Sequence, residues 1–273
     1  MSLNTILPFI STAIMLTFAA SVFQRFVVRR APHFLFWGIG LTMFGLASFS
    51  EGFLSLAWNQ WVFFIWYLFG AVLTAAWIGH GTMYLLFRKK WVHALTVVLV
   101  AGSLGAGYLM LQALPSLDTS LYRKDRPISE QYATKKLKPS EAAPEGVQTA
   151  TITYKGEEVT VTPGMMPLGT PVRSVTPFFN IYGTLTLVGG ALWSAFLFWR
   201  KRVLPNRVIG NVLIAAGALI IASASTLTRF GHGALLYPGE LLAAIFMFIG
   251  FLTAAAPQPG EEVVSPVPAP AGN

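Results

Sequence analysis

The chain has no cysteine and very few charged residues. The absence of cysteine excludes disulfides, thiolate metal sites and cysteine nucleophiles. Only 11% of the 273 residues are charged, whereas soluble domains carry about a quarter charged residues. A soluble fold of this size could not keep its surface hydrated with so few charges. Because 54% of the residues are hydrophobic, lipid is the solvent that suits this composition.

The apolar residues form long runs rather than an alternating pattern, which favours membrane-spanning helices over a β-barrel. About 20 apolar residues suffice for one helix to cross a bilayer. The sequence therefore predicts an all-α, polytopic transmembrane helix bundle, with four spans in residues 1–111 and three in residues 177–256. The predicted spans are Thr5–Val28, Phe34–Ala57, Trp61–Phe87, Trp91–Leu111, Pro177–Trp199, Val208–Thr228 and Pro238–Ala255.

The positive charges support this count and predict an orientation. The net charge of +8 invites a nucleic-acid interpretation, but the basic residues cluster at the ends of apolar runs, as the positive-inside pattern requires. We therefore expect a multi-pass protein of the cell (cytoplasmic) membrane that binds no nucleic acid, with its N-terminus outside and its C-terminus in the cytoplasm. The clusters expected on the cytoplasmic side are Arg25, Arg29 and Arg30, then Arg88, Lys89 and Lys90, and then Arg200, Lys201, Arg202 and Arg207.

Two segments are too polar for the membrane. Residues 112–176 are expected to form an extracytoplasmic loop, whose first part, around Lys135, Lys136 and Lys138, we expect to be flexible. Residues 150–162 alternate in the manner of a β-hairpin with Gly156 at its turn. Since an isolated hairpin is marginal in water, it should lie on the helix ends or on a partner. The Pro-rich tail, residues 257–273, is expected to be disordered and cytoplasmic.

Small residues recur every seven positions in the second and sixth spans. This spacing places them on one helix face, where they allow close packing. It suggests two three-helix units joined by the fourth span, although glycine seams are also common in membrane helices without any repeat. The residues are Gly38, Gly45 and Gly52 in the second span, and Gly210, Gly217 and Ala224 in the sixth.

A candidate ligand or proton site comes from the ionisable residues of the spans, because such groups are expensive in a membrane. Glu51 shares a helix face with Ser48 and Ser55, so it is either a proton- or cation-binding carboxylate in an outward cavity or a neutral carboxyl hydrogen-bonded to these hydroxyls. Glu240 follows a Pro-Gly pair, which predicts a position in the first turn of a helix, as a partner of the helix dipole. Arg229 should lie near both acids and could pair with either.

His80 is flanked by Gly79 and Gly81. The two glycines could let a flat cofactor approach, but a bis-His haem needs a second histidine at similar depth. The other histidines, His33, His93 and His232, are expected at the membrane edges or outside it. A hydrogen-bonded structural histidine is the favoured interpretation, and we expect no cofactor and no metal.

Residues 66–86 of the third span, together with residues 211–217, resemble a group of uncharacterised multi-span bacterial integral membrane proteins. The resemblance lies in the run from Trp66 to Trp77, in Gly81-Thr82-Met83-Tyr84-Leu85-Leu86, and in Asn211-Val212-Leu213-Ile214-Ala215-Ala216-Gly217. It implies a multi-span helical fold of about seven helices. It brings no activity, cofactor or functional residue.

The sequence favours a non-enzymatic function. No span contains lysine, and the chain lacks a phosphate-binding glycine loop, a metalloprotease His-Glu motif and a Gly-x-Ser-x-Gly elbow. We expect a sensor, binding module or accessory subunit, in contact with the lipid bilayer and engaging a protein partner or a small ligand through its outer loop. The alternative is a small-molecule or proton-coupled transporter that uses Glu51.

Overall fold

The computed structural model of the chain describes residues 3–87, 90–124, 126–137, 149–202, 204–229 and 233–256. Within these residues, seven helical segments are long and apolar enough to cross a membrane by length and composition. The predicted number of spans is therefore matched. The helices are α1 (Leu3–Arg29), α2 (Pro32–Leu54), a third segment made of α3 (Gln60–Ile65), the π-helical η1 (Trp66–Leu73) and α4 (Thr74–Leu86), then α5 (Lys90–Ala113), α7 (Pro171–Arg200), α8 (Pro205–Arg229) and α9 (Leu236–Ala255).

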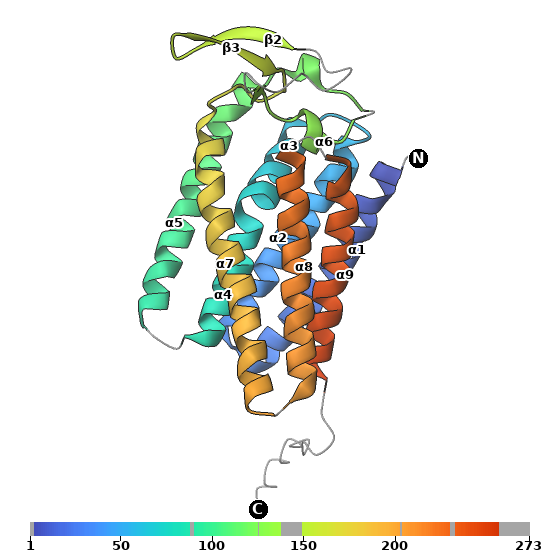
Figure 1. Cartoon of the computed structure of the whole chain (residues 1–273), viewed down its shortest axis with the longest axis vertical. Helices are drawn as coiled ribbons and strands as arrows, with labels where there is room; N and C mark the ends of the chain where they lie inside the picture. Colours follow the sequence, from blue (N-terminus) through green and yellow to red (C-terminus); the bar gives the residue numbers. More distant parts are fainter. Residues whose placement is uncertain are drawn as a thin grey trace, which may run out of the picture.

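Six of these segments form a ring, and α5 lies outside it (Figure 1). Around the ring, α1 packs on α2, α2 on α4, α4 on α7, α7 on α8, α8 on α9, and α9 back on α1. The helix α5 contacts only one side of the ring, through α4, η1 and α7. Its outer face is open, since Val97 is 69% and Leu104 is 71% exposed. The open face is apolar, as expected of a helix that meets lipid.

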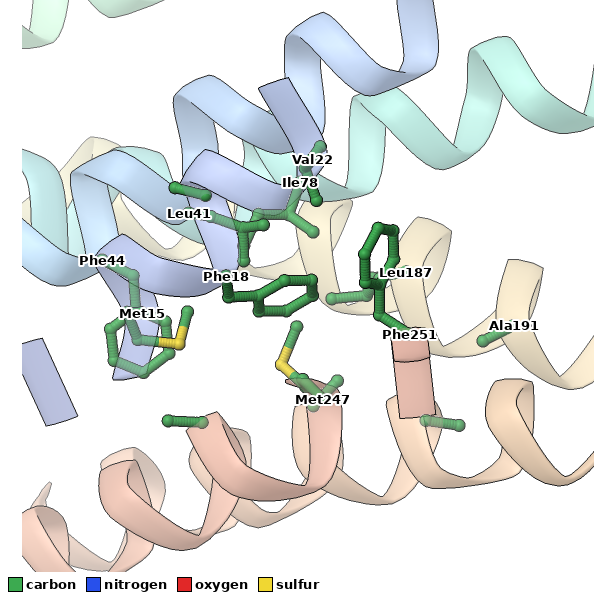
Figure 2. Close-up of a cluster of buried hydrophobic side chains, with 14 of the residues drawn as sticks. Met15, Phe18, Val22, Leu41, Phe44, Ile78, Leu187, Ala191, Met247 and Phe251 are labelled. Carbon is green, nitrogen blue, oxygen red and sulfur yellow. The ribbon is translucent and has the colours of Figure 1, made fainter. Parts of the chain in front are cut away.

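Apolar side chains fill the centre of the ring. Phe18 of α1 stacks on Phe248 of α9, with ring centroids 5.1 Å apart, and every ring segment contributes to the cluster. The cavity left among these side chains has a volume of about 50 Å³. The middle of the bundle is therefore solid and apolar. Figure 2 labels Met15, Phe18, Val22, Leu41, Phe44, Ile78, Leu187, Ala191, Met247 and Phe251 of this cluster.

The two glycine seams pack differently. In α2, each glycine of the seam lies under a large side chain of α1, and these side chains also recur every seven residues. The pairs are Gly38 with Phe23, Gly45 with Leu16, and Gly52 with Phe9. In α8, Gly210 instead meets the backbone carbonyl of Gly250, and Gly217 meets that of Ala243, both in α9. The seam of α2 faces the preceding helix and the seam of α8 faces the following one. Since they face non-equivalent neighbours, the seams do not support an internal repeat.

The residues between α5 and α7 form a folded cap over one end of the bundle, which we call the sheet end (Figure 1). The cap comprises the described residues 114–137 and 149–170. Besides the short helices η2 (Leu114–Ser116), η3 (Thr119–Leu121) and α6 (Ile128–Gln131), it holds β1 (Lys135–Lys136), β2 (Ala150–Tyr154) and β3 (Glu157–Thr162). The strands form an antiparallel sheet in the order β1-β3-β2.

The predicted hairpin is present. Thr151 pairs with Thr160 and Tyr154 with Glu157. The two turn residues between the strands, Lys155 and Gly156, both have positive φ, which is the conformation of a two-residue hairpin turn.

The prediction that the loop is flexible around Lys135 is wrong, because Lys135 and Lys136 form a third strand against β3. Lys138 and the tail of residues 257–273 lie outside the described residues.

The cap is attached to the helix ends by hydrogen bonds. The Tyr122 hydroxyl donates to the Leu54 carbonyl (2.5 Å), and the Lys135 ammonium donates to the Thr228 carbonyl (3.1 Å). These contacts satisfy backbone carbonyls that the last turn of a helix leaves free. Burial raises the pKa of Tyr122 above 10.0, so this phenol stays a donor at neutral pH. The cap is therefore held on the helix ends, and the hairpin is joined to this attachment through the pairing of β1 with β3.

For two spans, the predicted start was a proline that in fact lies inside the helix. The helix α7 begins at Pro171 rather than Pro177, and Pro177 lies inside it. The helix α9 begins at Leu236 rather than Pro238, after the short η4 (Gly233–Leu235). Proline suits a first turn, but it is tolerated further along where its missing N–H is not needed.

Because α8 and α9 pack closely, one added methyl group at their contact should lower the stability of the protein more than one added at an open position. A Cβ on Gly210 would lie 2.5 Å from the Gly250 carbonyl oxygen, so Gly210→Ala should lower the free energy of unfolding by about 1–3 kcal/mol. The matched control is Gly189→Ala in α7, where a Cβ meets nothing within 4 Å. The control should be neutral or stabilising by up to about 1 kcal/mol. Reversible unfolding in detergent measures both, and equal effects would contradict the close contact.

Candidate functional site beneath the cap

Two carboxyl groups meet inside the sheet end of the bundle. Glu51 of α2 is 3% exposed and Glu240 of α9 is 8% exposed. The two carboxyl groups lie within electrostatic range of each other. Since α2 and α9 both pack on α1, the pair joins the two neighbours of α1. The predicted candidates Glu51 and Glu240 therefore belong to one site.

The hydrogen bonds of the pair differ from those expected. The Trp66 indole N–H donates to Glu51 Oε1 (2.8 Å), and the Ser48 hydroxyl lies 3.5 Å from Glu240 Oε2 rather than on Glu51. Ser55 donates instead to the Gly52 carbonyl (2.7 Å), and its hydroxyl lies 3.1 Å from that of Thr5. The prediction that Ser48 and Ser55 serve Glu51 is therefore wrong.

Trp66 reaches the site from the π-helical segment η1, of which it is the first residue. A π turn holds more residues than an α turn, so it rotates the side chains that follow and often occurs at functional sites. Trp66 is 5% exposed, and Tyr132 of the cap packs edge-on against its ring at 5.3 Å between centroids. Trp66 thus connects the carboxyl pair to the cap.

Glu240 was expected in the first turn of its helix, and this expectation is wrong. Because α9 begins at Leu236, the first turn contains no acid and Glu240 lies beyond it. Tyr237 lies one turn before Glu240, on the same helix face. The Tyr237 side chain is 1% exposed. Glu240 is therefore a buried group of the bundle rather than a solvated dipole partner.

Tyr237 and Ser129 close the site from above. The Tyr237 hydroxyl lies beside Ile128 and Ser129 of α6 in the cap, and within electrostatic range of both carboxyl groups. Among the described residues, Tyr237 Oη, Ser129 Oγ and Glu51 Oε2 are buried without a hydrogen-bond partner of good geometry. Buried polar atoms are nearly always paired. Three such atoms gather where the cap meets the carboxyl pair.

We expect the pair to hold at least one proton, because two like charges close together away from water are costly. A carboxyl group that keeps its proton can donate to a carboxylate beside it, which only accepts hydrogen bonds. Arg229, the predicted counter-charge, ends α8, and its side chain lies outside the described residues.

His80 is a buried, fully hydrogen-bonded histidine. Its Nδ1 lies 2.7 Å from the Tyr182 hydroxyl and its Nε2 lies 2.8 Å from the Thr96 hydroxyl. Neither nitrogen is open to iron, so the haem alternative receives no support from this geometry. His33 and His93 lie at the opposite end of the bundle, and His232 lies outside the described residues.

Comparisons of the chain with protein-family models, with curated proteins and with solved structures find no match. The roles of these residues are therefore inferred from their chemistry and positions.

The proton expected at the pair makes the effect of substitutions there predictable. Glu51→Gln should change the free energy of unfolding by less than about 1 kcal/mol, because glutamine keeps an acceptor for Trp66 and adds a donor for Glu240. Trp66→Phe should cost about 1–3 kcal/mol, because it leaves a buried acceptor without its donor. Unfolding of the purified protein in detergent measures both effects.

The control for these variants is Glu157→Gln, which changes an exposed carboxylate of the hairpin and should have no effect. A large loss of stability in Glu51→Gln that a second substitution, Arg229→Gln, restores would contradict a protonated pair. It would show that Glu51 is ionised and paired with Arg229, since breaking a buried ion pair costs about 3–5 kcal/mol.

Proposed function

We propose that this chain is a multi-pass protein of the cell membrane that acts as a non-enzymatic sensor or accessory module. Its cap would be the part that engages a protein partner or a small ligand. The observation that carries the proposal is the contact between the cap and the buried carboxyl pair, through Ser129 and Tyr237. A ligand that moves the cap would change the surroundings of the most polar group inside the bundle.

The hairpin offers the cap a surface for a partner. In the sheet order β1-β3-β2, the strand β2 lies at an edge, so its outer backbone groups can pair with an added strand. The exposed side chains of the hairpin are polar, as in Thr153, Lys155 and Glu158. This combination suits recognition of an extended protein segment.

The alternative, a proton-coupled or small-molecule transporter that uses Glu51, draws on the same carboxyl pair. A transporter places its substrate near the middle of the membrane, between discontinuous helices. The centre of this ring is instead apolar and holds a cavity of only about 50 Å³. The pair is also sealed by the cap rather than open to solvent, since both carboxyl groups are buried. These features favour the sensor over the transporter.

The proposed orientation places the cap and the N-terminus outside the cell and the C-terminus in the cytoplasm, by the positive-inside rule. A reporter tag inserted at Glu145, in the segment between β1 and β2, should be accessible from outside intact cells. A tag at the C-terminus should become accessible only after lysis. Accessibility of both tags from the same side would remove one span and contradict the charge argument.

The partner surface can be tested with one introduced thiol, because the chain has no cysteine. Glu158→Cys places a unique thiol on the exposed hairpin, and Lys201→Cys places one at the opposite end, also exposed. With a thiol-directed cross-linker in intact membranes, Glu158→Cys should give a discrete cross-linked partner that Lys201→Cys does not give. If the two variants capture the same proteins, or if neither captures any, the cap is not the binding surface.

A further inference from the structure

A second polar site lies at the end of the bundle opposite the cap. A pocket of about 370 Å³ opens between the turn that joins α1 to α2, the end of α4 and the start of α5. His33, Tyr84 and His93 contribute polar side chains to its wall. The pocket also contains Pro32, the first residue of α2, a helix without a capping side chain. The positive end of the α2 dipole therefore adds to the field in this pocket.

The surroundings of the pocket are cationic. Arg29 and Arg30 precede the pocket residue Ala31, and Lys90 lies one turn before His93; all three basic side chains are exposed. The carboxylates of the described residues all lie at the sheet end, in α2, α9 and the cap: they are Glu51, Asp118, Glu130, Glu157, Glu158 and Glu240. Within the described chain, no acid balances the charge near the pocket. An anion that enters the pocket would meet this positive charge.

A chain of hydrogen bonds orients His93. The Tyr84 hydroxyl lies 2.8 Å from His93 Nδ1 and 2.7 Å from the Thr96 hydroxyl. Thr96 continues to His80 Nε2, and His80 Nδ1 continues to the Tyr182 hydroxyl. The Thr96 hydroxyl donates its one proton to the Val92 carbonyl (3.1 Å), so it accepts from both Tyr84 and His80 Nε2.

The direction of this chain decides what His93 offers to the pocket. The Tyr84 hydroxyl donates to Thr96, so it accepts from the Nδ1–H of His93. An anion in the pocket favours a proton on Nε2 as well, because a nearby negative charge stabilises the charged imidazolium. Nε2 then donates a hydrogen bond to the anion.

We propose that this pocket binds a phosphate group, with His93 and His33 as donors and with Arg29, Arg30 and Lys90 supplying the surrounding charge. The shared chemistry is an anionic phosphate, which either an anionic lipid headgroup or free phosphate can supply. The pocket lies where the spanning helices end, beside Phe87 and Trp91, which are 39% and 42% exposed. Exposed aromatic side chains of this kind sit at the headgroup level of a bilayer. The site is separate from the cap, and it does not depend on the sensor function.

The experiment uses the purified full-length protein in a neutral detergent. Phosphatidylglycerol, phosphatidylcholine and inorganic phosphate are each titrated, and binding is followed by thermal stability and by lipid retention in native mass spectrometry. The variants are His93→Ala, Tyr84→Phe and the control Lys201→Ala, which removes an exposed cation at the same end but outside the pocket. Because His93 is exposed, its removal should leave the fold intact, and Tyr84→Phe keeps the ring that packs on Phe36.

Phosphatidylglycerol should stabilise the wild type and Lys201→Ala equally. Its affinity should fall about tenfold in His93→Ala, which loses a hydrogen bond to a charged group. A smaller loss is expected in Tyr84→Phe, which loses only the group that orients His93.

Weak binding of phosphatidylcholine and phosphate would identify an anionic lipid as the source. Binding of inorganic phosphate that depends on His93 would identify free phosphate instead, and would equally support the site. If no probe binds, or if His93→Ala binds as well as Lys201→Ala, the proposal is wrong.

Discussion

The burial of the two carboxyl groups of Glu51 and Glu240 in one place is the constraint on which the sheet end depends. An ionisable group among apolar helices is stable only when its polar atoms are matched nearby. Here the matching groups come from four separate parts of the chain: α2, the π-helical turn of Trp66, α9 and the cap. A segment that looks from the sequence like a loose loop is therefore folded down onto the helix ends. Its contact residues Ser129 and Tyr132 meet Tyr237 and Trp66.

The apolar centre of the ring separates two polar ends. The described acids all lie at the sheet end, where lysines and arginines of the cap accompany them, and the other end holds basic residues and the proposed phosphate pocket without a described acid. The helix α5 belongs to neither the ring nor its core. It is held by apolar packing of Ala106, Met110 and Ala113 in a second buried cluster and by hydroxyl groups. Thr96 bonds to His80, and Ser103 accepts from the Trp77 indole (3.1 Å). Hydrogen bonds of this kind join membrane helices where hydrophobic packing alone gives no preference.

The sequence predicts which residues form helices and the hairpin, but it does not predict how the helices are rotated relative to one another. Long apolar runs predict the seven helical segments, and strict alternation around Gly156 predicts the hairpin, because both patterns are local. The partner of Glu51 is not local. It depends on the order of the helices around the ring, which has no signature in one sequence. The same limit explains why Ser48 was assigned to Glu51, although its hydroxyl lies near Glu240.

The geometry of the sheet end makes the cap and the charge of the carboxyl pair interdependent. While the cap is docked, the pair is shut off from water and is expected to hold at least one proton. If the cap lifts through Ser129 and Tyr237, water reaches the carboxyl groups, and solvation then favours their charged forms. Linkage requires the converse to hold with the same free energy, so a change of charge at the pair alters how firmly the cap docks. A partner that binds the hairpin can therefore act on the interior of the bundle without entering it. The apolar ring centre also explains why such a change would stay at the sheet end, unless a helix that carries one of the two acids moves as a whole.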